Sequence, residues 1–433
     1  MKPESTLATE VVTSRDLLNR GHELRNKGAL REIIGRQVAQ FCFQTHGESL
    51  RAVVLTGSLA RNEATLVKEE KSCRLLGDAE FLLIFHTHAP LPPKLAMSLL
   101  RQNVESSISG LGIAGEITFS AAHPKYLRSL CPHIFAYELR NCGQVVGGDS
   151  EILRHIPSFS AADIPLEDGW RLLSNRMVEQ LEGLEVLEQK PNLLPPRLHY
   201  RTVKLYLDMA TSFLLFAGEY APTYEERAQR LRVLADSQRA EDRTPFNLRQ
   251  FCDRVSECTQ WKLSEINCGT SSISQPIVGL DSTWWEEAVG YAQALWGWEL
   301  GLLTGSTGEV DNQELLKRWM NCQPVYRHFA GWLYVLRNQG WHRSWRNWPR
   351  WCRLAWRAAP RYWVYGAASE VFARLPGLPE EVGAGPTDAD WERLRAFLPV
   401  IPGSEKYSHL PCWGTLAKEI AWNYRTFLAE TVS

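Results

Sequence analysis

The chain has 433 residues, enough for two or three domains, because a single hydrophobic core usually stops growing near about 250 residues. It is 44% hydrophobic and 22% charged, an ordinary balance that excludes long disordered tracts as the dominant feature. Its formal net charge of -1 argues against a protein that coats nucleic acid over its whole surface, although a local basic patch is compatible with regional binding.

The cysteines and the first residues of the chain indicate a cytoplasmic protein. The 10 cysteines are scattered without CxxC pairs, which argues against a zinc site or a disulfide framework. The start, Met1 to Ser5, lacks the apolar segment of a signal peptide, and no run of about 18 uncharged apolar residues occurs in the sequence. We therefore expect buried free thiols in a reducing compartment.

The first 150 residues combine helical and strand-like patterns. The predicted elements are a helix over 24–43, strands over 52–55, 79–85 and 113–120, and two short strand-like pieces between 134 and 146. The strand at 52–55 ends in the turn-forming residues Thr56-Gly57-Ser58. We therefore predict an α+β fold class, with a small mixed-sheet domain over 1–150 followed by a large, mainly α-helical region.

The remaining sequence has mainly helical periodicity. Long helices are predicted over 170–187, 198–217 and 284–303. The loop-forming stretch that starts at Gly269 predicts a division into a helical domain over 151–270 and a C-terminal helical domain over 271–433. A Pro/Gly-rich stretch over 376–386 is expected to connect to the last helical segment.

The stretch from Gly57 to Glu80 carries the clearest chemical signal. A Gly57-Ser58 turn after a buried strand lets backbone amides and a hydroxyl approach a phosphate. Asp78 and Glu80 are two positions apart on a predicted strand, so both carboxylates project from the same face. This pair suits Mg²⁺, which binds carboxylates together with substrate phosphates.

A third carboxylate would complete a two-metal clamp. Glu116 is the expected one, because it shares a strand face with Thr118 while Ile117 and Phe119 occupy the other face. Glu138, on the next apolar piece, is the alternative.

The order of a strand, Gly-Ser, a helix and Asp-x-Asp/Glu on the next strand resembles the nucleotidyltransferase superfamily. That group includes DNA polymerase β, minimal nucleotidyltransferases and the kanamycin- and streptomycin-type adenylyltransferases. Residues 57–63, Gly-Ser-Leu-Ala-Arg-Asn-Glu, look like the Gly-Ser-x-Ala-Arg-Gly-Glu of the minimal enzymes, with Asn62 in place of the glycine. The resemblance covers roughly 52–148. Twenty positions separate Ser58 from Asp78, more than is common in the family, and the extra residues around 68–71 are expected to form a solvated helix extension or a loop.

The resemblance implies a nucleotide-binding bend beside a set of metal ligands. The implied site residues are Gly57, Ser58 and Arg61 for the nucleotide, and Asp78, Glu80 and Glu116 for two Mg²⁺ ions, with Mn²⁺ as the alternative ion. The implied reaction is nucleotidyl transfer, with ATP the first choice of NTP, to an acceptor hydroxyl with release of pyrophosphate. The acceptors, in order of preference, are a small hydroxylated molecule, a protein side chain and a nucleic-acid end. The alternative is a non-catalytic nucleotide-binding, scaffold or membrane-peripheral protein on a degenerate form of the fold.

One predicted helix carries charged residues on a single face. Arg201, Lys204 and Asp208 are spaced i, i+3 and i+7, and by the resemblance Lys204 would neutralise the triphosphate. A surface ion-pair row between Lys204 and Asp208 is the alternative. Asn175 and Arg176, in the preceding helix, are weaker candidates for the same role.

The segment 341–363 contains six tryptophans and six arginines and no acidic residue. Helical spacing separates the two residue types onto opposite faces, and Pro349 is expected to open a helix after Asn347. The segment therefore predicts a peripheral membrane helix, a face for a nucleic-acid or phosphorylated acceptor, a partner-protein surface, or a helix whose tryptophans pack into the core.

His86 and His88 follow the second predicted strand and indicate either a metal pair or a strand that ends at solvent. His328 and His342 receive no assigned role.

Overall fold

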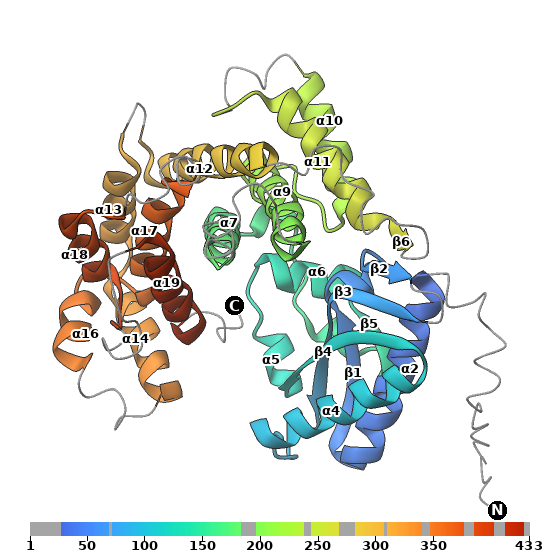
Figure 1. Ribbon diagram of the computed structural model, residues 1–433. Helices are drawn as coiled ribbons and strands as arrows, with labels where there is room; N and C mark the ends of the chain where they lie inside the picture. The colour runs from blue at the N-terminus through green and yellow to red at the C-terminus, as the bar shows by residue number, and fades with distance from the viewer. Residues whose placement is uncertain are drawn as a thin grey trace, which may run out of the picture. The chain divides into compact units, whose positions relative to one another are not determined.

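The computed structural model describes residues 27–68, 72–182, 196–237, 244–267, 282–306, 310–339, 347–375, 385–401 and 412–427 (Figure 1). The chain divides into two compact units. Unit 1 consists of residues 1–159 and 262–275, and unit 2 of residues 160–261 and 276–433. The described part combines a mixed sheet with a helical region, which confirms the predicted α+β class.

The elements of unit 1 are helices α2 (Lys27–His46), α3 (Gly57–Ala60), α4 (Lys94–Gly110), α5 (Pro124–Arg128) and α6 (Ile134–Cys142), strands β1 (Leu50–Thr56), β2 (Thr65–Lys68), β3 (Cys73–Phe85), β4 (Ile113–Ala122), β5 (Gln144–Gly148) and β6 (Glu265–Asn267), and the 3-10 helices η2 (Gly47–Ser49) and η3 (Ile152–His155).

The elements of unit 2 are the 3-10 helix η4 (Ala161–Asp163) and helices α7 (Leu166–Leu181), α9 (Pro196–Phe216), α10 (Tyr224–Asp236), α11 (Leu248–Leu263), α12 (Ser282–Thr304), α13 (Asn312–Cys322), α14 (Val325–Gln339), α16 (Trp348–Ala355), α17 (Pro360–Phe372), α18 (Asp388–Phe397) and α19 (Trp413–Phe427). The boundary between the units falls near the end of α11, after Trp261.

Strand β3 is the central strand of the sheet and has 13 residues. Its residues 80–85 pair antiparallel with β1, and its residues 73–76 pair antiparallel with β2. Strand β4 pairs with β3 in parallel and covers the opposite edge of both segments. Strands β1 and β2 therefore follow one another along the same edge of β3, and β5 and β6 extend the sheet beyond them.

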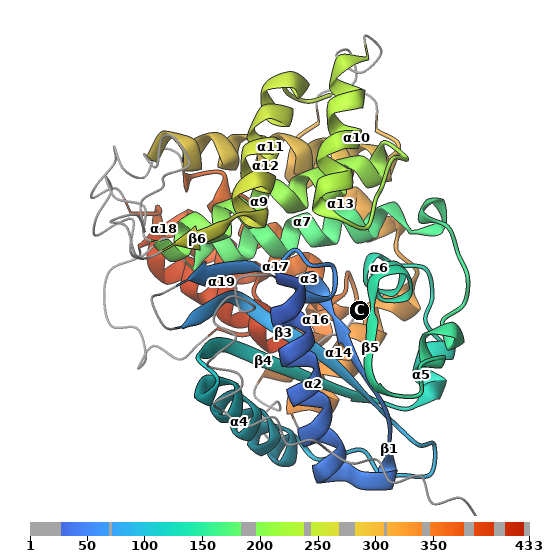
Figure 2. The ribbon, with the colours of Figure 1, turned by 90° about the vertical axis from the view of Figure 1, so that its right-hand side faces the viewer.

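Each face of the sheet has its own hydrophobic core, because side chains alternate along a strand. One core joins Val53 and Phe81 of the sheet to apolar residues of α2 and α4, the helices that Figure 2 draws beside the strands. The other joins Val54 and Leu82 to α5, α6 and η3. The predicted strands over 52–55, 79–85 and 113–120 and the first predicted helix are all present.

The prediction of a strand at the start of 134–146 is wrong, because residues 134–142 form helix α6. The ring nitrogen of His133 accepts a hydrogen bond from the Ala136 amide at 3.0 Å and so caps the helix. Ala136 and Leu139 lie three positions apart and are both buried, which is helical spacing. Only the second piece is a strand, β5.

The extra residues between Ser58 and Asp78 form neither a helix extension nor only a loop. Thr65 to Lys68 form strand β2, which pairs with Cys73 to Leu76 at the start of β3. Residues 69–71 lie outside the described part of the chain. The lengthened motif spacing therefore reflects a β-hairpin that extends the central strand.

The described helices of unit 2 share one hydrophobic cluster that extends from Trp170 to Phe427. Trp170 on α7 is fully buried, and its ring centroid lies 5.5 Å from Trp296 on α12 and 5.6 Å from Tyr365 on α17. The structure therefore differs from the expected division at 270/271, because helices from both sides of that boundary pack into the same core. Residues 268–281, which contain the expected loop, lie outside the described residues.

The Trp/Arg segment is divided between two helices. Pro349 lies in the first turn of α16 after Asn347, as expected, and Pro360 opens α17. Trp351 and Trp363 are buried in the unit 2 core, whereas Trp356 is 76% exposed. Residues 341–346 and most of the expected 376–386 connector lie outside the described part of the chain.

Glu299 on α12 is a fully buried carboxyl group within the unit 2 core. Neither of its side-chain oxygens forms a hydrogen bond of good geometry with a described residue. Burial raises the pKa of Glu299 well above its usual value, and the neighbouring Ser212 hydroxyl lowers it only in part. The folded protein therefore keeps Glu299 protonated at pH values where the unfolded chain ionises.

We expect Glu299→Gln to flatten the dependence of stability on pH. Above the usual glutamate pKa the wild-type unfolded state loses a proton that the folded state retains, so stability falls as pH rises, by at most about 1.4 kcal/mol per pH unit. Glutamine does not ionise and lacks this loss. Urea unfolding of both proteins at pH 5.5 and pH 8 measures the difference, and parallel profiles would contradict the buried neutral carboxyl.

Candidate active site

The Gly57-Ser58 bend lies directly against the carboxylate of Glu80. Thr56, the last residue of β1, is the register partner of Glu80 on β3. Gly57 has φ +69, a left-handed conformation that favours glycine. A Cβ atom at Gly57 would lie 2.8 Å from Oε1 of Glu80. The bend therefore requires glycine for its backbone conformation and for its close approach to the acid.

The pairing of β3 explains why the bend leaves the sheet at this point. Residues 77–79 lie between the β3 segments that pair with β2 and β1, so no strand of the described residues pairs with that edge beside Asp78. On the other edge the pairing with β4 shifts register between Arg74 and Asp78, and Gly77 has φ +112. Bulges of this kind redirect the side chains that follow them, here Asp78 and Glu80.

Asp78 and Glu80 lie on one face of β3, with the buried Ala79 on the other. Thr118 on β4 is the register partner of Glu80, and its hydroxyl donates to Oδ2 of Asp78 at 3.1 Å. This threonine was missed as a positioning residue, because the parallel register of β3 and β4 is not visible in the sequence. Both carboxylates therefore lie on the same sheet face, and that of Glu80 lies against the bend.

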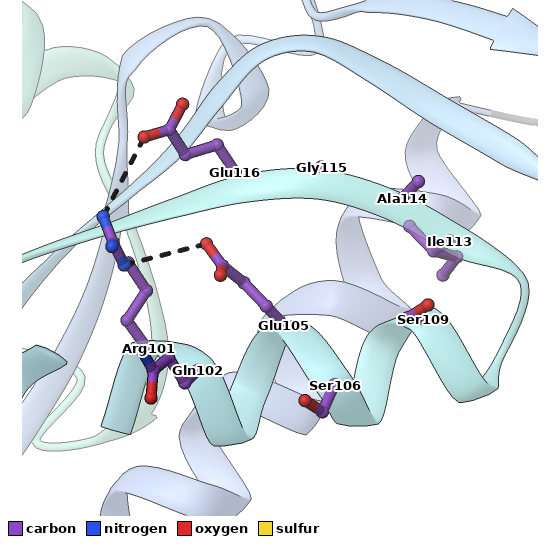
Figure 3. Close-up of a pocket in the computed structure, with 9 residues that line it drawn as sticks. All are labelled: Arg101, Gln102, Glu105, Ser106, Ser109, Ile113, Ala114, Gly115 and Glu116. Carbon is purple, nitrogen blue, oxygen red and sulfur yellow. Dashed lines mark ion pairs between the residues drawn. The ribbon is translucent and has the colours of Figure 1, made fainter. Parts of the chain in front are cut away.

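Glu116 is the register partner of Asp78, but its carboxylate does not join the other two acids. Its side chain is 67% exposed, and Oε1 lies 3.9 Å from Nη1 of Arg101 on α4. Figure 3 shows Arg101 between Glu116 and Glu105, along a groove of about 590 Å³ between α4 and β4. Among the described residues, no group of three or more histidines, cysteines or acids is arranged to hold a metal ion.

Comparison with known proteins adds no assignment to this geometry. No protein-family model, curated protein or solved structure matches the chain. The resemblance to nucleotidyltransferases therefore stays a prediction, and the functional argument rests on the arrangement of the side chains.

Arg61 forms a nearly buried ion triad with Glu63 and Glu138. Its Nε lies 2.7 Å from Glu63 and its Nη1 lies 2.5 Å from Glu138 on α6, with an Arg61 side-chain exposure of 6%. Arg61 thus forms ion pairs with two acids of its own unit, whereas the sequence predicts a nucleotide-binding role for it. Glu138, the alternative third ligand, pairs with Arg61 as well. The triad ties the end of the bend to α6.

The backbone conformation of Asn62 explains why the similar motif has glycine at this position. It has φ +62, the only positive value among the described residues other than glycine. Asparagine tolerates this left-handed conformation better than most residues. The substitution of glycine by Asn62 is therefore compatible with the same turn.

The charged face of α9 is part of an ion network with α7. Asp208 pairs with Arg176 at 2.6 Å, and Arg201 pairs with Glu182. Lys204 lies 5.8 Å from the centre of the Tyr200 ring, and together with Arg176 and Arg201 it lowers the pKa of Glu179 against the effect of burial. Asp208, one member of the alternative surface ion-pair row, thus pairs with Arg176 of the preceding helix.

Asn175, His86 and His88 have local contacts. Asn175 accepts a hydrogen bond from the Tyr365 hydroxyl at 2.5 Å. The rings of His86 and His88 stack with centroids 5.8 Å apart, at the end of β3. His328 is buried, and His342 lies outside the described residues.

We expect Arg61→Ala to destabilise the protein by about 3 kcal/mol or more, because it leaves two acids in a nearly buried site without their cation. Arg51→Ala is the matched control, since the Arg51–Asp149 pair is more exposed and should contribute about 1 kcal/mol or less. Denaturant unfolding gives both values. Equal losses would show that the Arg61 triad is not a buried structural unit.

We expect Gly57→Ala to destabilise the protein by about 1–2 kcal/mol through its left-handed backbone, and to displace the Glu80 carboxylate. Gly110→Ala is the control, because a Cβ atom there meets nothing within 4 Å. Thermal unfolding compares the two variants. Similar melting temperatures would contradict the strained approach of the bend to Glu80.

Proposed function

We propose that unit 1 transfers a nucleotidyl group, with ATP as the first donor to test, to an acceptor hydroxyl and releases pyrophosphate. The observation that supports this proposal most directly is the contact between the Gly57-Ser58 bend and Glu80, with Asp78 on the same sheet face. A glycine-containing bend offers backbone amides to phosphate groups, and the adjacent carboxylates suit a cation that accompanies a polyphosphate.

Asp78 and Glu80 fit one Mg²⁺ ion better than a complete two-ion cage. Mg²⁺ is commonly held by one or two carboxylates together with substrate phosphates, so two protein ligands are sufficient. The exposed Glu116 departs from the expected set of three. When bound, the ion would neutralise charge on the triphosphate, and Mn²⁺ is the alternative.

The residues of the bend and of β3 would share the work of positioning. Gly57 and Ser58 would hold the triphosphate, and Thr118 would orient Asp78 through its hydrogen bond. The acceptor oxygen forms a bond to the α-phosphorus while the bond from that phosphorus to the pyrophosphate oxygen breaks. Glu116, at the register position beside Asp78, would accept the acceptor proton or join the metal ligands.

Lys204 lies on α9 of unit 2, and its expected role in neutralising the triphosphate stays a prediction. The acceptors to test are, in order, a small hydroxylated molecule, a protein side chain and a nucleic-acid end. Unit 1 would supply the metal-dependent chemistry in each case.

A second candidate is nucleotide binding without turnover. The observation that favours it is the separation of Glu116 from Asp78 and Glu80, together with the lack of a three-ligand group in the described part of the chain. In that case the bend and the two acids would bind Mg²⁺ and NTP but would not activate an acceptor.

We expect Asp78→Asn/Glu80→Gln to lower Mg²⁺-dependent pyrophosphate release at least about 100-fold, because the variant loses both charged metal ligands. Label transfer from α-phosphate-labelled ATP to acceptor panels, or to the protein itself, identifies the product. Calorimetry of Mg²⁺ with a non-hydrolysable ATP analogue measures binding when the acceptor is absent.

Glu48→Gln/Glu151→Gln is the matched control, because it removes two exposed carboxylates of the same unit: Glu48 precedes the start of β1, whereas the bend follows its end, and Glu151 follows β5. The control should retain binding and turnover. Tight Mg²⁺-dependent nucleotide binding without turnover across the panels would favour the second candidate. Absence of Mg²⁺-dependent nucleotide binding by the wild-type protein would overturn both.

A further inference from the structure

Unit 2 contains a long stretch of sequence without acidic residues. From Leu315 to Ser369 there is no Asp or Glu, while ten Lys or Arg residues give the stretch a formal charge of +10. Because the whole chain has a net charge of -1, the remaining residues together carry -11. Such a charge asymmetry points to an anionic partner for this stretch.

Helix α14, within this stretch, exposes a continuous apolar face. Its exposed apolar side chains include Val325 (60% exposed), Tyr326 (69%), Phe329 (41%) and Leu333 (59%). At about 100° per residue these four positions fall within one third of the helix circumference. His328 and Trp332, which occupy the strip of the helix surface next to Val325, are buried in the unit. An amphipathic helix normally buries its apolar face, so this exposed face requires an explanation.

Helix α16 packs against α14 and adds arginines to the exposed apolar residues. The rings of Trp332 and Trp351 lie 5.7 Å apart and join the two helices inside the core. Trp356, at the end of α16, is 76% exposed, and Arg353 and Arg357 beside it are exposed as well. Neither arginine forms an ion pair with a described residue, whereas Arg350 donates to the backbone carbonyl of Leu398 at 2.7 Å.

We propose that one surface docks onto an anionic lipid bilayer. It is defined as Val325, Tyr326, Phe329, Leu333 and Arg337 of α14 together with Arg353 of α16 and Trp356 and Arg357, which directly follow α16. Aliphatic and aromatic side chains enter the region between headgroups and acyl chains, and arginines bind the lipid phosphates. No described helix is long and apolar enough to cross a membrane, so the docking is peripheral.

The composition of the surface favours lipid over the other anionic partners. Single-stranded nucleic acid binds through stacked aromatic rings and basic residues, and the exposed Val325 and Leu333 cannot stack with bases. A second copy of the surface would bring arginines against arginines with no acid from Leu315 to Ser369 to pair with them. A bilayer containing acidic lipid can bury the aliphatic side chains and also neutralise the positive charge of the arginines.

The test is co-flotation of the full chain with vesicles of phosphatidylcholine alone or with 30% phosphatidylserine, at low and at high salt. We expect binding to the acidic vesicles that weakens at high salt, because salt screens the arginines. Arg353→Ala/Arg357→Ala should lower the partition coefficient about 25-fold, or about fivefold for each arginine. Phe329→Glu/Leu333→Glu should reduce binding to the level seen with phosphatidylcholine alone.

Matched control variants separate this surface from general effects of charge and hydrophobicity. Val233→Glu/Leu302→Glu alters two apolar residues of unit 2 that are 72% and 51% exposed on α10 and α12. Arg232→Ala/Arg249→Ala removes two exposed arginines of the same unit. Both controls should bind acidic vesicles nearly as well as the wild type, and thermal unfolding should be unchanged in all four variants.

The proposal is overturned if acidic vesicles fail to bind the protein at low salt, or if the control variants lose as much binding as the α14 and α16 variants. Binding of a 20-nucleotide single strand in place of vesicles, with the same sensitivity to Arg353 and Arg357, would assign the surface to nucleic acid and overturn it too. A concentration-dependent dimer abolished by Phe329→Glu/Leu333→Glu, without vesicle binding, would assign it to self-association.

Discussion

The double pairing of β3 along one edge determines the geometry of the candidate site. One segment of β3 pairs with β1 and the other with β2. The residues that connect β1 to β2 therefore have to leave the sheet beside residues 77–79. Gly57 and Ser58 are the first residues of this connection, and Gly57 lies against the Glu80 carboxylate. The contact between the Gly57-Ser58 bend and the Glu80 carboxylate is thus a consequence of strand register.

Acidic residues around the bend fall into two electrostatic classes. Glu63 and Glu138 are neutralised by Arg61, which stabilises the connection between the bend and α6. Asp78 instead accepts a hydrogen bond from the neutral Thr118 hydroxyl and makes no ion pair with a described residue. A carboxylate that keeps its charge unmatched by protein cations is suited to an external cation. The same distinction could not be made from the sequence, where Glu63, Asp78 and Glu138 are simply three acidic residues.

The alternation of apolar and polar residues and the helical spacing of apolar residues were sufficient to predict the buried strands, the long helices and the shared face of Asp78 and Glu80. They failed where a local cap decided the outcome, as at His133, which starts a helix in a stretch with strand-like residues. They also failed for Glu116, because its strand and face were predicted correctly but the long-range contact with Arg101 was not. Spacing places a side chain on a face, whereas only tertiary structure shows which charge it meets.

The sheet of unit 1 is completed by residues from far along the chain. Strand β6 pairs in parallel with β2 through residues 265–267, after the chain has already formed several helices of unit 2. During synthesis, the outer edge of β2 therefore stays without its neighbour until more than half of the polypeptide has been made. Neither unit is a contiguous stretch that ends before the other begins, so a fragment cut near residue 160 would present an open strand edge of the kind that favours aggregation.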